Sequence, residues 1–314
     1  MDPSKNGDRP RFACIALDYE DTRHLYRTLN LPAPPVGDVM FGAVAERFQT
    51  ILARHGVSAT LFVVGEDILT DNNRRSLRRF VDSGHEVANH TMTHPFGMRE
   101  MAYADKVREI EGAQKLLEDV TGQPVVGYKA PAHDIDADVI DILEERGFHY
   151  DASVYPSYFN PLLNVCYRVV GGGRPLGLGD WQCSLAPNRP YRLGRPYWKT
   201  GTRSMVEFPI SQIPAVKFPV YATVMFTAGL RAFQAQFAAV RRMRFLTYVF
   251  HSFDLFDEND DGFVPALRRY PALRLPLAER LEMVDHVVKT IASRFQPVTY
   301  RRAVTQPEIL GAIL

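Results

Sequence analysis

Short apolar runs and amphipathic stretches alternate along the first half of the chain. Phe12 to Leu17 is a continuous apolar run, which is typical of a buried strand. From Val44 to Leu52 apolar residues recur at helical spacing, and Gly56 is placed to end that helix. The same alternation predicts further strands at 57–64, 86–88, 125–129 and 148–150, and helices around 77–81, 107–120 and 139–143. Repeated strands and helices with short turns predict parallel βα units.

The alternation stops between Tyr155 and Ser204 and then resumes. A segment of this length without a clear period is typical of a functional loop or lid. Its many aromatic residues predict either a platform for sugar stacking or the loop's own small core. Beyond it we expect strands at 205–210, 245–250 and 298–301, and helices at 230–240 and 277–295. About eight strands are compatible with an α/β barrel formed by a single catalytic domain over 1–314, with 1–11 as a flexible start.

Acidic residues follow the first predicted strand directly. Asp18 and Glu20 lie two positions apart, so an extended chain places both side chains on one face. Asp21 follows, and a turn that starts at Tyr19 would bring it into the place of Glu20. Because parallel sheets and barrels build their sites at the carboxyl ends of strands, these carboxylates are candidates for catalysis.

Two histidines stand four residues apart after the strand at 86–88. Pro95 disfavours helix at His94, so His90 and His94 are expected on a loop. Two neutral imidazoles and the carboxylate of Glu20 form a set that suits a catalytic divalent cation with open coordination positions. The sequence therefore predicts a metal site, with Zn²⁺ as the first choice and Co²⁺, Ni²⁺ or Mn²⁺ as alternatives.

Further polar residues supply the remaining parts of a hydrolytic site. Asp18 is free to act as general base on a water molecule, and His251, at the end of a later strand, is placed to protonate a leaving group. Lys129 is placed to pair with a carboxylate and orient it. Backbone N–H groups after Pro131, notably that of Ala132, are candidates to bind a developing oxyanion.

Five segments resemble, in order, the motifs of the polysaccharide deacetylases, the NodB-homology carbohydrate esterases of family four. The match includes the D-x-[DE] first motif of a cytosolic branch of that family. Lys129 stands where the family has Arg, which keeps the charge and loses the bidentate fork. The segments are Leu17–Asp21, His90–Pro95, Tyr128–Ala132, Tyr150–Ser153 and His251–Asp254.

The resemblance implies a distorted (β/α) barrel of seven to eight strands and metal-assisted removal of acyl groups, usually from N-acetylated sugars. The resemblance also implies that Asp151 lies on the substrate side of the site, together with Pro131 and Ala132. The expected function is removal of an N-acyl group, acetyl in the first instance, from an amino sugar or a related small or lipid-linked substrate. A deformylase or cyclic-amide hydrolase on the same fold is one alternative, and a catalytically silent carbohydrate-binding protein is another.

Composition limits the partners. The net charge of +1 does not point to nucleic acid or to an acidic membrane, and no uncharged run is long enough to span a bilayer. The polar start has no apolar stretch typical of a secretory signal, so the expected compartment is the cytoplasm. The fairly apolar segment Ile213 to Leu230 leaves room for peripheral contact with a lipid-linked substrate or for a homo-oligomer.

Overall fold

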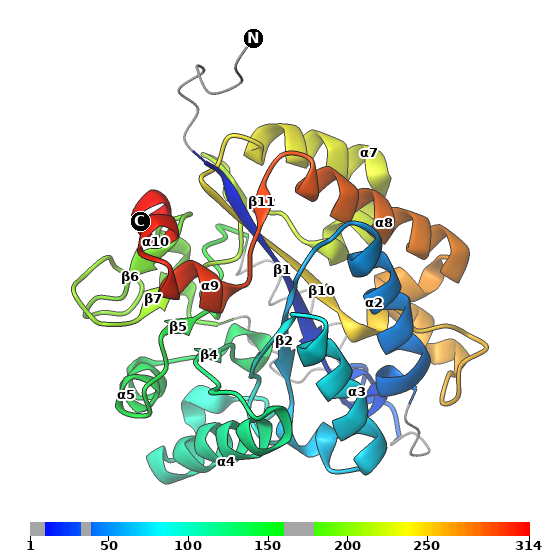
Figure 1. The fold of residues 1–314 in the computed structure, drawn as a ribbon, viewed down its shortest axis with the longest axis horizontal. Helices are drawn as coiled ribbons and strands as arrows, with labels where there is room; N and C mark the ends of the chain where they lie inside the picture. Colours follow the sequence, from blue (N-terminus) through cyan, green and yellow to red (C-terminus); the bar gives the residue numbers. More distant parts are fainter. Residues whose placement is uncertain (1–9, 33–38, 160–178) are drawn as a thin grey trace.

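The computed structural model describes residues 10–32, 39–159 and 179–314. One mixed sheet forms its centre (Figure 1), with its strands in the order β10-β1-β2-β3-β4-β5-β7-β6 and β11 beside β1. Every pair in it is parallel except β6–β7. Since this order has ends at β10 and β6, the described strands form a curled, open barrel, and the α/β fold class is confirmed. The strands are β1 (Phe12–Tyr19), β2 (Thr60–Val63), β3 (Glu86–Asn89), β4 (Gly127–Tyr128), β5 (Tyr150–Asp151), β6 (Tyr191–Arg192), β7 (Val206–Glu207), β10 (Phe245–His251) and β11 (Gln296–Pro297).

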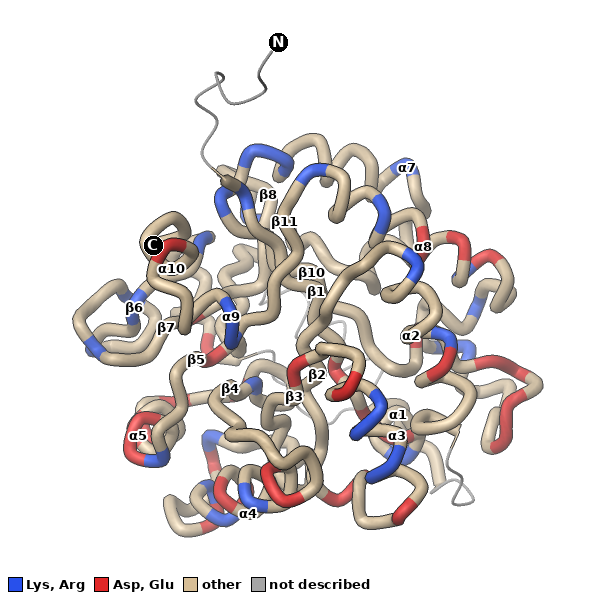
Figure 2. The backbone as a smooth tube through the Cα atoms, viewed as in Figure 1, with Lys and Arg blue, Asp and Glu red and all other residues tan. Residues whose placement is uncertain are grey.

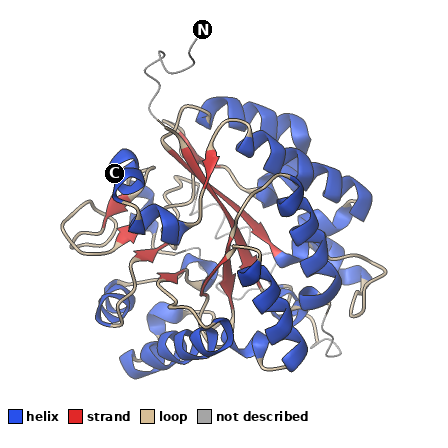
Figure 3. Ribbon diagram, in the orientation of Figure 1, coloured by secondary structure: helices blue, strands red, loops and turns tan. Residues whose placement is uncertain are grey.

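Helices cover the outside of the sheet (Figure 3). They are α1 (Thr22–Thr28), α2 (Ala45–Arg54), α3 (Asp71–Asp82), α4 (Tyr103–Thr121), α5 (Ala137–Glu145), α7 (Ala222–Val240), α8 (Leu277–Ala292), α9 (Tyr300–Thr305) and α10 (Pro307–Ile313). Shorter helical turns are η2 (Met40–Val44), η3 (Gly65–Ile68), η4 (Met98–Glu100), η5 (Pro131–His133), η6 (Trp181–Leu185), η7 (Ser252–Leu255), η8 (Pro265–Arg269) and η9 (Pro271–Arg274). A separate hairpin pairs β8 (Gln212–Ile213) with β9 (Phe218–Pro219). Among the helices of the described ranges, none has the length and apolar character needed to cross a bilayer.

Strand register aligns the carboxyl ends of the strands that carry the candidate residues. Asp18 is the partner of His251 in the β1–β10 pair. Asn89 is the partner of Tyr128, so His90 and Lys129, the residues that follow them, begin at the same level of the sheet. Because parallel strands all end at one edge, the motifs that are distant in sequence meet there.

Aromatic side chains fill the sheet interior near the opposite edge. The ring of Tyr300, at the start of α9, lies 4.7 Å from Phe208 and 5.3 Å from Tyr150, measured between centroids. It also contacts Phe62 at 5.9 Å and Phe245 at 6.1 Å. Tyr300 is fully buried, so the C-terminal segment closes this end of the sheet.

The predicted strand at 298–301 is wrong. Pairing with β1 ends at Pro297, and α9 begins three residues later. The Thr299 side chain accepts a hydrogen bond from the N–H of Arg302 and caps the helix. The proline, which has no N–H to donate, and the capping threonine together explain why the apolar run does not continue as a strand.

Parts of the long aromatic segment are ordered into small elements. Residues 179–204 contain η6 and β6, and Tyr191 and Tyr197 are buried there, as a loop with its own core would have them. Trp181, in contrast, is 63% exposed. Residues 160–178 of this predicted loop lie outside the described residues. Residues 1–9 of the predicted flexible start also lie outside them.

Candidate metal and catalytic site

Glu20, His90 and His94 direct one ligand atom each toward a common point. The Oε1 atom of Glu20 lies 3.5 Å from Nε2 of His90 and 3.4 Å from Nε2 of His94. All three residues are buried. Metal–ligand bonds of about 2.1 Å in tetrahedral geometry separate ligand atoms by roughly 3.4 Å, so these residues fit one small divalent cation.

The second nitrogen of His90 fixes the tautomer that a ligand needs. Its Nδ1 lies 2.7 Å from the backbone oxygen of Lys129. Since a carbonyl oxygen only accepts, Nδ1 carries the proton and the lone pair of Nε2 stays free for a metal. For His94, Nδ1 has no hydrogen-bond partner in the described part of the chain.

The loop that carries both histidines has an unusual backbone. Thr91 has a φ of 68° and His94 a φ of 54°. Residues with a Cβ rarely occupy this left-handed region of backbone conformation. The Oδ1 atom of Asn89 accepts from the N–H of Thr91 at 2.8 Å, which holds the start of the loop. A Cβ at Gly65 would lie 2.6 Å from Sδ and 3.3 Å from Cα of Met92, so the neighbouring loop packs closely against this one. The loop is therefore fixed from both sides.

Glu20, and not Asp21, faces the imidazoles. Asp21 caps α1 instead, because its Oδ1 accepts from the N–H of Arg23 at 3.0 Å. Burial alone would raise the pKa of Glu20, but the imidazoles of His94 and His90 outweigh it and hold that pKa well below its usual value. Of the two carboxylates that the sequence left open, Glu20 is the one that lies within 3.5 Å of both imidazoles.

Asp18 lies beside this group and is paired on one oxygen only. Its Oδ2 accepts from Nζ of Lys129 and lies 3.6 Å from Nε2 of His251. Its Oδ1 has no hydrogen-bond partner among the described residues. Burial would raise the pKa of Asp18, but the ammonium of Lys129, followed by the histidines, lowers it below its usual value. An ionised carboxylate with a free oxygen is therefore available next to the candidate metal site.

His251 is held by the turn that follows β10. Oδ2 of Asp254 accepts from the backbone N–H of His251 at 2.9 Å, and Oδ1 accepts from the hydroxyl of Tyr270 at 2.8 Å. Arg280 is almost fully buried and donates to the backbone oxygen of Asp254 at 2.9 Å. The side chain of His251 remains 25% exposed, so its ring is accessible at the rim of the site.

Pro131 and Ala132 lie on η5, which begins two residues after Lys129. Pro131 is buried, whereas Ala132 is half-buried and has a φ of 50°. His133 follows with a φ of 60°, and its ring stacks on Tyr155 with centroids 5.1 Å apart. Ala132 therefore lies on a half-buried turn with a left-handed backbone conformation.

Asp151 is fully buried and forms a pair with a second buried carboxylate, Glu207. Its Oδ1 accepts from the hydroxyl of Ser153 at 2.6 Å, and Oε1 of Glu207 accepts from the N–H of Val154 at 2.9 Å. Burial raises the pKa of Asp151, and burial together with the charge of Asp151 raises that of Glu207. This pair was not expected from the sequence, because Glu207 stands in an apolar run without a motif.

His24 is a second residue that the sequence did not single out. Its Nε2 lies 3.0 Å from both carboxylate oxygens of Asp67, and its ring lies 4.8 Å from that of His94. Burial lowers the pKa of His24 to about 3 and raises that of Asp67 to about 7. His24, on α1, thus packs against His94, one of the two candidate imidazole ligands.

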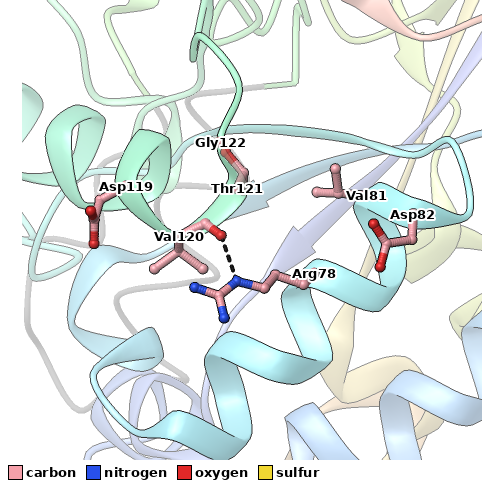
Figure 4. A pocket seen from close by; sticks show the side chains of 7 residues that line it. All are labelled: Arg78, Val81, Asp82, Asp119, Val120, Thr121 and Gly122. Atoms are coloured by element: carbon pink, nitrogen blue, oxygen red, sulfur yellow. Dashed lines mark hydrogen bonds between the residues drawn. The ribbon is translucent and has the colours of Figure 1, made fainter.

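A cavity of about 340 Å³ between α3 and α4 contains none of the candidate residues (Figure 4). Arg78 lines it and donates from Nε to the backbone oxygen of Val120 at 2.8 Å. With Asp82 and Asp119 also at its wall, this cavity lies between helices and away from the strand ends that form the site.

Comparison with known proteins places part of the site in a family. Residues 36–150 match the family described as polysaccharide deacetylase. This range includes His90, His94 and Lys129, whereas Asp18, Glu20 and His251 lie outside it.

Two curated proteins are similar over shorter stretches. The peptidoglycan deacetylase-like protein FGM2 of Gibberella zeae is 34% identical over 113 residues, which cover 34% of this chain and 32% of that protein. The chitooligosaccharide deacetylase of Rhizobium leguminosarum bv. phaseoli is 56% identical over 45 residues, which cover 14% of this chain and 19% of that protein. The chain thus spans about a third or less of the length of these two relatives.

A solved structure is similar over nearly the whole chain. The probable polysaccharide deacetylase of Pseudomonas aeruginosa PAO1 superposes with a TM-score of 0.57 at 15% identity, covering 95% of this chain and 91% of that one. At this identity the match establishes the fold.

Proposed function

Because the chain belongs to the polysaccharide deacetylase family, the NodB-homology carbohydrate esterases of family four, we propose that it is a metal-dependent amide hydrolase. It removes an N-acyl group, in the first instance acetyl, from an amino sugar or a related small or lipid-linked substrate. The observation that carries the proposal is the convergence of Glu20, His90 and His94 beside Asp18 and His251 at one edge of the sheet.

Glu20, His90 and His94 are the residues that would hold the cation, through Oε1 and the two Nε2 atoms. A divalent cation bound there supplies Lewis-acid polarisation and lowers the pKa of water toward neutrality. Zn²⁺ suits this donor set best, and Co²⁺, Ni²⁺ and Mn²⁺ are the alternatives.

Asp18 acts as general base in this proposal. Its unpaired Oδ1 accepts a proton from the attacking water, while Lys129 holds the other oxygen and keeps the carboxylate ionised. Lys129 is therefore a positioning residue. It orients the base without touching the substrate.

His251 acts as general acid on the leaving amine. Its Nε2 lies 3.6 Å from Oδ2 of Asp18 while the ring stays 25% exposed, so the ring is accessible to a leaving group at the rim of the site. The backbone N–H of Ala132, positioned by Pro131, donates to the oxyanion that develops on the carbonyl.

Asp151, predicted on the substrate side, takes a supporting part in this proposal. Its carboxylate is fully buried and binds Ser153, whose hydroxyl in turn accepts from the N–H of Ala130 at 2.8 Å. Asp151 thus supports the segment that presents Ala132.

Release of acetate from N-acetylated chitooligosaccharides by metal-loaded protein tests the proposal. Asp18→Asn is expected to lower kcat by about 10²–10⁴-fold with metal content unchanged. Asp119→Asn, an exposed carboxylate on α4, is the matched control and keeps full activity. Formyl and ring amides in the same assay separate the alternative hydrolase activities. Equal rates for wild type and Asp18→Asn would refute the proposed role, and saccharide binding without turnover would favour a silent binding protein.

A further inference from the structure

The turn η5 ends in a histidine that the proposed mechanism does not use. His133 has a left-handed backbone, with a φ of 60°. Its N–H donates to the backbone oxygen of Ala130 at 3.2 Å, and the N–H of Asp134 donates to that of Pro131 at 3.0 Å. Arg99 binds the carboxylate of Asp134 through its side chain and its backbone N–H. The backbone of His133 is therefore held on both sides along the chain.

Two contacts fix the ring of His133 and its tautomer. The ring stacks on Tyr155, with centroids 5.1 Å apart and 23° between the planes, and Nδ1 lies 3.0 Å from the backbone oxygen of Ser153. Since a carbonyl oxygen only accepts, Nδ1 carries the proton and Nε2 presents a lone pair. Within the described ranges Nε2 makes no hydrogen bond. The residue is half-buried, so part of the ring is open to a ligand.

The ring of His133 is neutral and lies near the proposed base and acid. Burial, together with the ammonium of Lys129, lowers the pKa of His133 to about 3, so Nε2 is unprotonated at neutral pH. The side chains of Asp18 and His251 also act electrostatically on this ring. Among the described residues His133 belongs to none of the groups whose ligand atoms could hold a cation. It is therefore a neutral hydrogen-bond acceptor beside the reacting groups.

A neutral acceptor selects uncharged donors, and the overall charge does not favour an ionic substrate. The net charge is +1, and in Figure 2 helix α4 carries both signs along its length. In the proposed mechanism the leaving nitrogen takes its proton from His251, so the donors that remain for His133 are hydroxyl groups. An N-acylated amino sugar carries such groups around its ring.

We propose that Nε2 of His133 accepts a hydrogen bond from a hydroxyl group of the substrate sugar. This inference rests on the proposed function and names the feature of the substrate that the site recognises. A site built to bind a hydroxyl group disfavours an analogue that lacks it, because the acceptor is then left unpaired. One neutral hydrogen bond supports a preference of about 10-fold in kcat/KM. His133 is thus a specificity-determining residue of the site.

Two variants that differ by one methylene group test the acceptor. Both lose the ring and its stacking, but the amide of His133→Asn reaches only the position of Nδ1, whereas that of His133→Gln reaches the position of Nε2 and offers an oxygen there. With N-acetylated chitooligosaccharide, His133→Asn is expected to lower kcat/KM by about 10-fold and His133→Gln to lower it less. With N-acetylcyclohexylamine, an amide without hydroxyl groups, the two variants should be equal. His149→Asn, at an exposed histidine, is the control.

A binding readout separates this inference from the proposed function. Nitrogen NMR of isotope-labelled imidazoles follows Nε2 of His133 in the full chain that carries Asp18→Asn and is loaded with Zn²⁺, where turnover is expected to be slow. The resonance is assigned by its absence once His133→Asn is added. Chitooligosaccharide is expected to shift this resonance, and N-acetylcyclohexylamine at the same concentration to leave it in place. The measurement keeps His133 itself, so it also covers the case in which a variant at this position does not fold.

The outcomes of the two experiments are distinct. A shifted Nε2 resonance without acetate release by wild type would refute the hydrolase and keep the saccharide contact. Acetate release with an unmoved resonance, or no binding of the saccharide, would refute the contact. A shift with N-acetylcyclohexylamine as well would make the amide N–H the donor and overturn the hydroxyl assignment. Equal losses of kcat/KM in His133→Asn and His133→Gln would reduce His133 to a structural role.

Discussion

Glu109 on α4 binds Thr93 through both of its carboxylate oxygens. Oε2 accepts from the backbone N–H of Thr93 at 2.8 Å, and Oε1 accepts from its hydroxyl at 2.8 Å. The same Oε2 accepts from the N–H of Met92 at 3.0 Å. A single side chain thus holds the middle of the loop whose ends carry His90 and His94.

Replacing Glu109 is therefore expected to weaken metal binding without removing a ligand. Glu109→Ala should lower the affinity for Zn²⁺ by about 10–100-fold, as loss of supporting hydrogen bonds around metal ligands usually does. Competition with a chromogenic chelator measures it. Glu111→Ala, on the same helix and paired with Lys115, is the control. Equal affinity of wild type and Glu109→Ala would mean that the loop keeps its geometry unaided.

Lys129 is expected to control the ionisation of Asp18. In Lys129→Met the ammonium that lowers the pKa of Asp18 is gone while burial still raises it, so that pKa rises. Because the proposed base must be ionised, the acid limb of the profile of kcat/KM against pH should move to higher pH. Lys129→Arg restores the charge and should return the limb toward its wild-type position. An unmoved acid limb in Lys129→Met would contradict the proposed pairing of base and lysine.

Tyr300 is expected to be a main contributor to stability. It fills the space between Phe62, Tyr150, Phe208 and Phe245, so Tyr300→Ala leaves a cavity and should lower the free energy of unfolding by about 3–5 kcal/mol. Tyr300→Phe keeps the ring and loses only the 3.3 Å contact with the Thr247 hydroxyl, so its cost should be roughly 1 kcal/mol. Urea unfolding measures both. Similar losses for the two variants would show that the ring does not fill this space.

The buried pair Asp151 and Glu207 is expected to make stability depend on pH. Their folded pKa values are raised, so the folded state binds protons more tightly than the unfolded state. Their contribution is thus fully present below about pH 4, where unfolded carboxylates also protonate, and is lost as pH rises through the raised values. Glu207→Gln removes part of this loss, so its melting temperature should fall less than that of wild type between pH 5 and pH 8, as differential scanning fluorimetry can measure. Glu282→Gln, an exposed control on α8, should follow wild type. Parallel curves for Glu207→Gln and wild type would contradict the pairing.

The sequence predicted the parts of the site that follow directly from strand ends. Asp18, His90, Lys129 and His251 each follow or end a strand of a parallel sheet, and one shared edge is enough to bring them together. The fold class follows from the same alternation. The cytoplasmic location and the oligomeric state stay predictions, since no structural feature described above bears on them.

Other features depend on packing that no local pattern encodes. Strand alternation favours Glu20 over Asp21, but a turn at Tyr19 would reverse that choice, and no local pattern shows that Asp21 caps α1. Glu207 reads as part of an apolar strand, and its partner Asp151 lies 56 positions earlier. The rings of His24 and His94 lie 4.8 Å apart because α1 packs beside the loop that carries His94.

The metal content of purified protein tests the central claim most directly. Wild type loaded with Zn²⁺ and passed over a desalting column is expected to retain about one ion per chain, held by Glu20, His90 and His94. The double variant His90→Ala, His94→Ala should retain almost none, while the control His55→Ala, His149→Ala, which removes two histidines elsewhere, should retain as much as wild type. Equal metal in wild type and in the His90→Ala, His94→Ala variant would contradict the site.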